Sequence, residues 1–260
     1  MTTVVVAIGL LGPFFAPYAP DLTVSTPFGG PSVDHPFGLD YLGRDVLSRW
    51  LWGGRSVLVL ATAATLLGVV GGLCIGLVAA YRRDWLDGAL MRSTDLILGF
   101  PPLLLFLLVL VAFGNGNGPL IAIIGLYHAI RMSRVVRAAA REVIVLPYIE
   151  ASLARGDPAR HILGKEVLPN ILSPVLIDAG FRFIYSVIII ASLSFLGFGI
   201  RPPAADWGLM IAENLSALQL NPWATLVPAL TLALLSVGVN LVTDAKSRGP
   251  GRLLSQESRP

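Results

Sequence analysis

The chain has 260 residues, of which 55% are hydrophobic and 13% are charged. Soluble domains carry roughly a quarter charged residues, and a mean hydropathy of +0.74 is typical of a protein embedded in lipid. The formal charge of +3 would suit a nucleic-acid partner only if basic residues were interleaved with stacking aromatics, and here they gather at predicted membrane edges. The single cysteine, Cys74, excludes an internal disulfide framework or a cysteine-based metal site. The composition predicts one all-α membrane domain over residues 1–260.

Runs of apolar residues predict the membrane spans, each of which needs about 20 residues to cross the hydrocarbon core. In chain order the expected spans are residues 4–15, 57–80, 96–113, 120–130, 171–200 and 224–242. The fourth run is short, but its helix would continue through Arg131 and Arg134 if their side chains snorkel to the headgroups. Residues 114–119 supply the glycines and proline of a tight reversal before that helix. The sequence therefore predicts six transmembrane helices.

The first predicted span is the weakest. Residues 4–15 are too few to cross the core, and Pro17 and Pro20 stop any continuation of the helix. We interpret them as a trimmed first span whose translation start lies upstream. A secretory signal is the alternative, but no basic residue precedes this stretch and no clear cleavage site follows it.

The distribution of basic residues predicts the orientation, because lysine and arginine are retained on the cytoplasmic side. Residues 81–95, 131–170 and 243–260 together hold fourteen of the nineteen lysines and arginines. The loops 16–56 and 197–223 hold four, accompanied by six acids. We therefore expect a core over residues 56–245, a cytoplasmic loop at 141–170, external loops at 16–56 and 197–223, and both termini in the cytoplasm.

The largest cytoplasmic loop contains the signals of a helix, a sharp turn and a second helix. Gly156 can adopt a positive φ and end the first helix, while Asp157 can cap the next one with Pro158 at its first position. Pro169 is expected to close the second helix. Arg155 and other basic side chains would then be available to an acidic partner surface. A solvated connector is the alternative interpretation.

The same stretch resembles the conserved loop of binding-protein-dependent importer permeases, in which E-A-A is followed by a glycine and then by L-P. Glu150, Ala151, Gly156, Leu168 and Pro169 match this pattern, whereas Ser152 stands in place of the second alanine. In that family the loop contains the coupling helix, which sits in a cleft of a separate ATPase subunit. The resemblance therefore implies that the coupling loop of this chain comprises Glu150, Ala151, Ser152, Arg155, Gly156, Asp157, Pro158, Leu168 and Pro169.

Two further stretches, residues 35–49 and 191–208, look like the C subunit of dipeptide, oligopeptide and nickel permeases. The resemblance implies the MetI-like importer permease fold in the bacterial cytoplasmic membrane. It also implies a related second permease of the B-subunit type, an extracytoplasmic binding protein, and two ATPase subunits or one fused pair. ATP and magnesium would bind to the ATPases, so this chain is expected to hold no cofactor and no metal and to catalyse no reaction.

Charges within the predicted spans form a second candidate site. Asp178 and Arg182 stand four residues apart, so they share one helix face and can form an ion pair near the membrane edge. The sharper hypothesis is that they face the transport path or the partner permease, because an ion within a span is usually paired or lines a water path.

Other polar and aromatic residues near the membrane edges have simpler expected roles. Arginines at three- and four-residue spacing form a stripe that we expect to contact lipid headgroups; they are Arg131, Arg134, Arg137 and Arg141. Trp50, Trp52 and Trp207 are expected at water–lipid boundaries, and Asp45 is expected to cap a short external helix.

Missing motifs weaken the competing functions. The sequence has no G-x-x-x-x-G-K-[ST] loop to cradle ATP, and its histidines, His35, His128 and His161, are scattered without neighbouring ligands. A membrane-embedded enzyme therefore has little support. A self-sufficient secondary transporter or channel remains the alternative, since Asp178 could act as an intramembrane acid.

Overall fold

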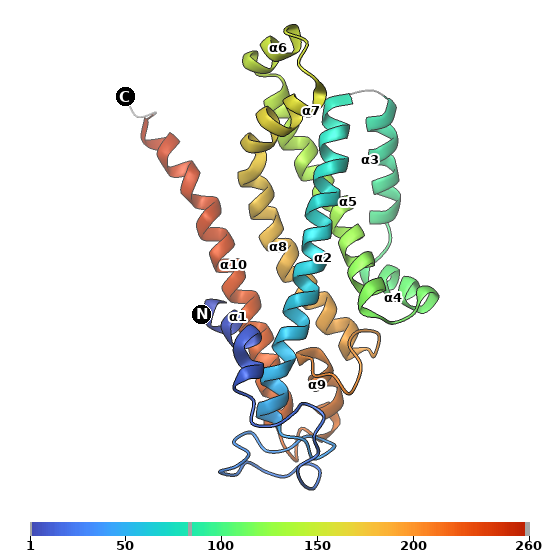
Figure 1. Ribbon diagram of the computed structural model, residues 1–260, viewed down its shortest axis with the longest axis vertical. Helices are drawn as coiled ribbons and strands as arrows, with labels where there is room; N and C mark the ends of the chain where they lie inside the picture. Colours follow the sequence, from blue (N-terminus) through green and yellow to red (C-terminus); the bar gives the residue numbers. More distant parts are fainter. Residues whose placement is uncertain (1, 83–84, 258–260) are drawn as a thin grey trace.

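A computed structural model describes residues 2–82 and 85–257, and every regular element within these ranges is helical. Figure 1 shows an elongated bundle of helices, which confirms the all-α prediction. The longest helices are α2 (Val46–Arg82), α5 (Asn117–Ile144), α8 (Leu168–Phe195) and α10 (Trp223–Glu257). The shorter ones are α1 (Thr2–Leu11), α3 (Trp85–Leu98), α4 (Pro102–Phe113), α6 (Pro147–Ala154), α7 (Ala159–His161) and α9 (Trp207–Asn214), together with 3₁₀ turns at Gly12–Phe14 and Leu215–Ala217.

Among the described residues, three helical segments are long and apolar enough to cross a membrane: Val46–Arg82, Asn117–Ile144 and Ala159–Phe195. The second of them confirms that the helix runs on through Arg131 and Arg134. Val4–Phe14 and Trp223–Val239 are shorter apolar helices at the positions of the first and last predicted spans. The reversal predicted at residues 114–119 lies between α4 and α5, which begins at Asn117.

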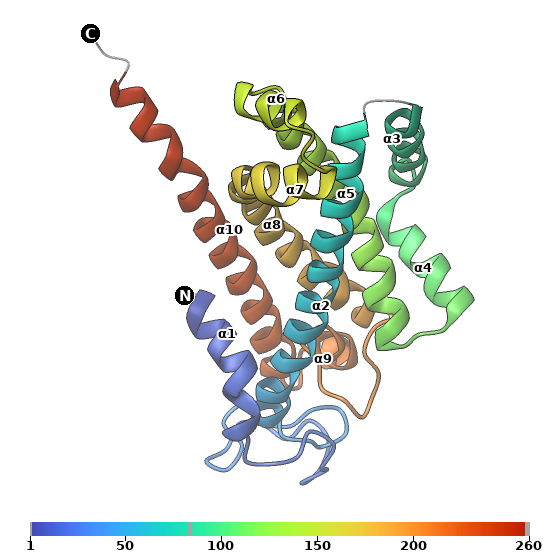
Figure 2. The ribbon, with the colours of Figure 1, turned by 45° about the horizontal axis from the view of Figure 1, so that its top comes forward.

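The span predicted over residues 96–113 is not one uninterrupted helix. This segment is divided between α3 and α4, whose axes bend by 89° at the break. Pro101 and Pro102 explain the bend, because proline has no N–H to donate and disfavours helical backbone in the residue before it. The two helices form either a broken span or a re-entrant one, and Figure 2 shows α4 running outward beside α5.

The centre of the bundle is the contact between α2 and α5. Gly68, Gly72 and Gly76 recur every four residues on α2 and pack against His128, Met132 and Val136, which recur every four residues on α5. A Cβ atom at any of these glycines would collide with α5. Small residues at this spacing let two helix backbones approach closely, as they do in membrane interfaces. α8 packs on the same pair through Val187 and Ile190, among others.

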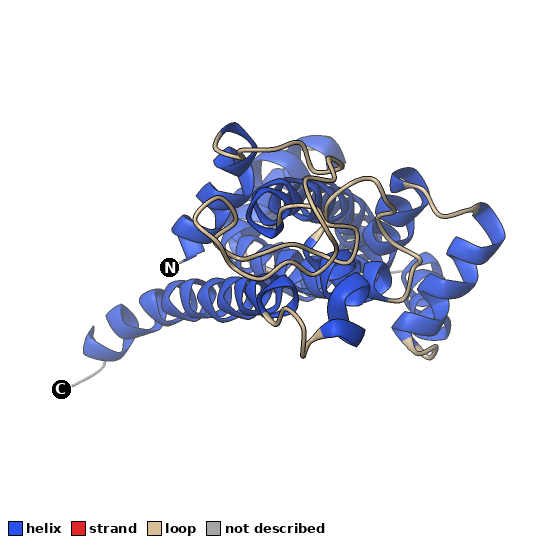
Figure 3. Ribbon diagram, turned by 90° about the horizontal axis from the view of Figure 1, so that it is seen from below, coloured by secondary structure: helices blue, strands red, loops and turns tan. Residues whose placement is uncertain are grey.

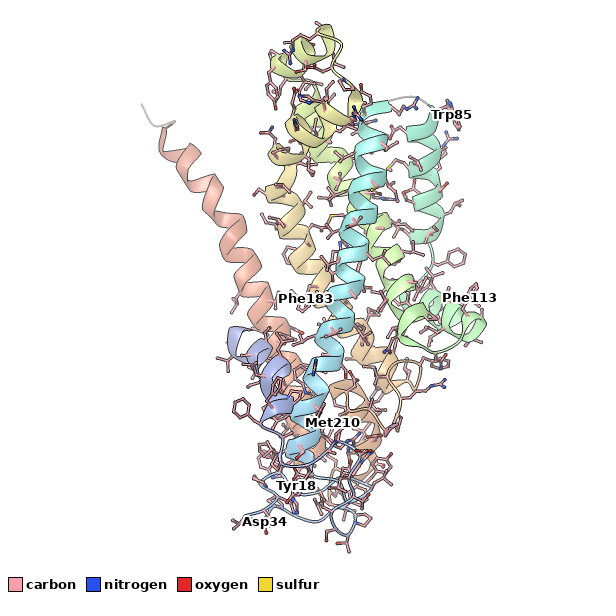
Figure 4. The ribbon with its side chains drawn as sticks, in the orientation of Figure 1. Tyr18, Asp34, Trp85, Phe113, Phe183 and Met210 are labelled. Carbon is pink, nitrogen blue, oxygen red and sulfur yellow. The ribbon has the colours of Figure 1, made fainter. Side chains whose placement is uncertain are left out.

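The two ends of the bundle carry different structures. Figure 4 places Tyr18 and Asp34 at one end and Trp85 at the other, with Phe113 and Phe183 between them. The long loop before α2 crosses the first end, where Figure 3 shows it lying over the helix ends. α6 projects beyond the second end in Figure 1, and α7 lies beside the end of α2.

Candidate functional site

The turn between α6 and α7 is built around Gly156, whose φ of +81° is a left-handed conformation that favours glycine. Its N–H donates to the carbonyl of Leu153 at 3.0 Å, and the N–H of Asp157 donates to the carbonyl of Ser152 at 3.1 Å. These bonds satisfy carbonyls that α6 leaves open at its C-terminus. Nothing lies within 4 Å of the place where a Cβ would stand. The glycine is therefore required by backbone conformation, as the sequence predicted.

The predicted cap at Asp157 is wrong. Pro158 occupies the N-cap position with extended backbone, and α7 begins one residue later. The Asp157 side chain instead accepts a hydrogen bond from Nη2 of Arg155 at 2.8 Å. Pro158 was expected at the first helical position, but its ψ of 147° is extended. The helix therefore starts at the residue after it.

The prediction that Pro169 closes the second helix is also wrong. Residues Ile162–Val167 form a π-helical segment that leads from α7 directly into α8. Within it the N–H of Leu168 donates to the carbonyl of Leu163, five residues back. The wider turn accommodates the proline, which would break a regular helix, and such segments recur at functional sites. α7 and α8 are therefore joined without a break into one helical segment, Ala159–Phe195.

A polar cluster holds α6 against this π-helical segment. The hydroxyl of Ser152, which is 2% exposed, donates to Oε1 of Glu166 at 2.7 Å and accepts from Nη2 of Arg155 at 2.7 Å. Ile149 and Ile162 are fully buried beneath it. Ser152 thus joins two helices, a role that its sequence position gave no sign of.

His161 lies in the same cluster, and the prediction that it has no neighbouring ligand groups is wrong. Ligand-type atoms of Asp157, His161 and Glu166 lie within 4.8 Å of one another. His161 therefore does have neighbouring donor groups, brought to it by the turn and by the wide π-helical spacing. Arg155 already pairs with Asp157 at 2.8 Å and approaches Glu166 at 4.0 Å, so the group forms part of an ion-pair network.

The outer face of α6 is exposed. Glu150 and Ala151 lie on it beside large apolar side chains, of which Tyr148 is 44% and Leu153 is 45% exposed. Among the residues that the structure describes, Glu150 forms no ion pair. An exposed surface that mixes apolar side chains with charge is typical of a protein contact site.

Ion pairs link α3 to α5. Asp87 accepts from Nε of Arg137 at 2.5 Å and from Nη2 of Arg141 at 2.5 Å, and Asp95 pairs with Arg134. Three of the four arginines of the predicted stripe therefore form ion pairs with acids of α3. The acids lie on α3, so the spacing of the arginines along α5 does not by itself predict these ion pairs.

Arg131, the remaining member of the stripe, stands over the ring of Tyr127 with its Cζ 5.9 Å from the ring centroid. On α8, Arg182 and Asp178 form the predicted ion pair, with Nε–Oδ2 and Nη2–Oδ1 distances of 2.9 Å. Two cavities, of about 450 and 380 Å³, have both Arg131 and Arg182 in their walls. The structure thus brings the two helices' charges to one place.

Comparison with known proteins identifies the family of this chain. Residues 72–249 match the family described as binding-protein-dependent transport system inner membrane components. The chain belongs to this family. It is therefore the permease component of an ATP-binding-cassette importer, and this excludes the self-sufficient transporter that the sequence left open.

Individual relatives agree with the family. A Brucella ovis protein named as a peptide permease is 33% identical over 89% of this chain and 78% of its own length. The glutathione transport system permease protein GsiD of Pectobacterium atrosepticum is 34% identical over 83% of this chain and 71% of its own length.

Solved structures share the fold. The inward-facing MetNI methionine transporter superposes with a TM-score of 0.59 at 19% identity, over 77% of this permease and 97% of that chain. An amino acid transporter determined with histidines gives a TM-score of 0.52 at 22% identity, over 74% and 89%.

At the other end of the permease, residues 35–49, the first stretch that resembled C subunits, meet Glu213 of α9 in a buried ion-pair network. Oδ2 of Asp40 accepts from Arg44 at 2.8 Å and from Arg49 at 2.6 Å, while Glu213 accepts from Arg49 at 2.6 Å. Asp40 and Arg49 are fully buried. Buried ions persist when they are paired, so this network fastens the loop before α2 to α9.

Two predictions at this end need correction. Trp207 is fully buried against Gly53 and Gly54 of α2 and donates its Nε1–H to the carbonyl of Trp50 at 2.9 Å, so it does not lie at a lipid boundary. Asp45 does cap a helix, accepting from the N–H of Ser48 at 2.7 Å, but that helix is the 37-residue α2. The expected short external helix is simply the start of α2.

Asp206 is the N-cap of α9 and is fully buried. Its Oδ1 accepts from the N–H of Leu209 at 3.0 Å. Burial raises the pKa of its carboxyl to about 6, because desolvation disfavours the charged form more than the nearby hydrogen bonds and Arg49 favour it.

Proposed function

We propose that this permease moves peptides, or a related small solute that carries the same groups, inward across the bacterial cytoplasmic membrane. Relatives at 33–34% identity are named as peptide and glutathione permeases. The permease would work beside a related second permease of the B-subunit type, with a binding protein outside and two ATPase subunits, or one fused pair, below. ATP and magnesium would bind to those ATPases.

The observation that carries the proposal is the continuity between the projecting loop and a membrane helix. α7, the π-helical segment and α8 form one uninterrupted helical segment of 37 residues, Ala159–Phe195. Ser152, Glu166 and Arg155 fasten α6 to its base. A push on the exposed face of α6 would therefore be transmitted to α8, where Asp178 and Arg182 lie.

In this proposal the coupling residues divide by task. Glu150, Ala151 and Arg155 present the exposed contact face, and Gly156, Asp157 and Pro158 shape the turn. Leu168 and Pro169 lie where the π-helical segment becomes α8. Asp178 and Arg182 would line the path or meet the second permease.

A matched pair of proline variants tests the coupling role. Gly156 and Gly197 have the same backbone conformation, with φ of +81° and +80°, and each donates its N–H to a carbonyl at 3.0 Å. Gly156→Pro and Gly197→Pro thus remove equal local features at opposite ends of the helical segment that joins α7 to α8. In the reconstituted complex, only Gly156→Pro should abolish the stimulation of ATPase activity by loaded binding protein. Stimulation and uptake that survive Gly156→Pro would refute the coupling role.

We also propose that both termini and the α6–α7 loop are cytoplasmic, because fourteen of the nineteen basic residues fall on that side of the predicted topology. Single cysteines at Asp34 and Glu150, in a Cys74→Ser background, test this orientation. A membrane-impermeant maleimide should label the first in intact cells and the second only after the membrane is opened. The reverse pattern would invert the topology.

A further inference from the structure

Arg131 is the charged group in the membrane region that the coupling proposal leaves unexplained. It is the fifteenth of the 28 residues of α5, so it lies at the middle of a spanning helix. Its side chain is exposed, and its one described contact is the face of the Tyr127 ring at 5.9 Å. An arginine at this depth is costly in lipid, which argues that it faces a water-filled or ligand-filled space.

The neighbouring charges do not neutralise it. Asp178 uses both carboxylate oxygens on Arg182, and Arg134 is paired with Asp95 on α3. Arg182, like Arg131, is the fifteenth of 28 residues in its helix. The walls of the larger cavity therefore contain two guanidinium groups and one carboxylate, and the walls of the smaller contain three guanidinium groups and no carboxylate. The charge left over is positive and belongs to Arg131.

The rest of the cavity lining suits an organic solute. The rings of Tyr127 and Tyr185 stack with an interplanar angle of 18° and centroids 6.4 Å apart, which places aromatic surface beside the guanidinium groups. Cavities of about 380 and 450 Å³ fall within the range of small-molecule sites.

We propose that Arg131, with Arg182 and the Tyr127–Tyr185 pair, binds a carboxylate of the transported solute within the membrane. A guanidinium group matches a carboxylate with two parallel N–H···O bonds, and such charge-assisted bonds are strong away from bulk water. The permease would thereby favour solutes with a free carboxylate, such as peptides with an unmodified C-terminus. This inference rests on the proposed function, since it concerns the solute that the importer moves.

The test measures uptake by the complete reconstituted complex, with its second permease, ATPases and binding protein. The probe is a synthetic mixture of two- to five-residue peptides, each present as the free acid and as the C-terminal amide, with imported peptides quantified by mass spectrometry. Arg131→Gln should lower uptake of the free acids about tenfold, the usual scale for losing a hydrogen bond to a charged group, and leave the amides unchanged. Arg131→Lys should recover most of the loss because it keeps the charge.

Arg92→Gln is the matched control, because Arg92 is an exposed arginine of α3 that lies in neither cavity wall. It should import acids as the wild type does. ATPase stimulation by loaded binding protein should persist in Arg131→Gln, which separates this site from coupling.

Three outcomes would overturn the site. One is equal import of acids and amides by the wild-type complex, a result that needs no variant to fold. Another is unchanged acid uptake in Arg131→Gln. The third is equal loss in the lysine and glutamine variants. A wild-type complex that shows no ATP-dependent peptide uptake at all would instead refute the proposed function, and the carboxylate site with it.

Discussion

The hydroxyl of Ser152 lies 2.7 Å from Oε1 of Glu166, so a side chain of α6 is hydrogen-bonded to the segment that continues into α8. Glu166 is only partly accessible, and its other oxygen, Oε2, has no hydrogen-bond partner among the described residues. The Ser152 hydroxyl therefore donates to a carboxylate of which only one oxygen has a hydrogen-bond partner. This relationship makes the position sensitive even though alanine is what the family pattern has there.

The first prediction is that Ser152→Ala loosens α6 from α7. Losing a partner of a mostly buried acceptor costs about 1–2 kcal/mol, so the melting temperature of the purified permease should fall. ATPase stimulation by loaded binding protein should fall several-fold, because α6 would move without carrying α8. Ser93→Ala is the control, since this exposed serine bonds only to a carbonyl of its own helix. Equal behaviour of the two variants would show that the Ser152 bond carries no coupling.

The second prediction concerns the glycine ridge of α2. Gly72→Ala should destabilise the permease by about 1–3 kcal/mol, because its new methyl group would collide with Met132 and force α2 and α5 apart. Gly88→Ala makes the same chemical change in α3, where nothing lies within 4 Å. That control should be neutral or stabilising by up to about 1 kcal/mol, since alanine favours helix. Thermal unfolding in one detergent compares them directly; similar losses would contradict the close α2–α5 contact.

Features that depend on residues close together in the chain were predicted correctly from the sequence. The turn at Gly156 and the ion pair between Asp178 and Arg182 each involve residues a few positions apart, so chain geometry alone predicts them. The membrane helices followed from apolar runs for the same reason. The apolar length of residues 96–113 predicts a span but not its break, which depends on Pro101 and Pro102.

Features that join distant segments were not predictable. Asp87 and Arg137 are 50 residues apart, and a stripe of arginines considered alone resembles a headgroup contact. Likewise Asp40 and Glu213 meet at Arg49 only because the loop before α2 and the helix α9 lie at the same end of α2. The π-helical segment was not predicted because proline ordinarily ends a helix. The residues before Pro169 contain no pattern that indicates a wider turn.

The third prediction tests the α3–α5 ion pair by a double-mutant cycle. Asp87→Asn, Arg137→Gln and the double variant should give a coupling free energy of about 1–3 kcal/mol, because these side chains are only 11% and 25% exposed and bond through two close contacts. Denaturant unfolding of the purified permease provides the four free energies. The pair of Asp95 and Arg134 is 65% and 42% exposed, so the same cycle there should give less than about 1 kcal/mol. A larger coupling at the exposed pair would contradict this ranking.

The last prediction is a pH dependence that originates at Asp206. Burial raises the pKa of its carboxyl from 3.8 to about 6 in the folded permease, so the folded state binds the proton more tightly than the unfolded state. Its contribution to stability is therefore greatest at low pH and is lost as the pH rises from about 4 to about 6. The full loss is up to about 3 kcal/mol, from about two units at 1.36 kcal/mol each.

Asp206→Asn removes this titration while keeping an oxygen that can accept from the N–H of Leu209, and asparagine caps helices as well as aspartate does. Melting temperatures of the two proteins should be compared from pH 4 to pH 7. As the pH rises, the melting temperature of the variant should increase relative to that of the wild type. Asp34→Asn, at an exposed loop aspartate, should leave the wild-type profile unchanged. Parallel curves for wild type and Asp206→Asn would show that the buried carboxyl does not change its protonation across this range, and the pKa shift would be refuted.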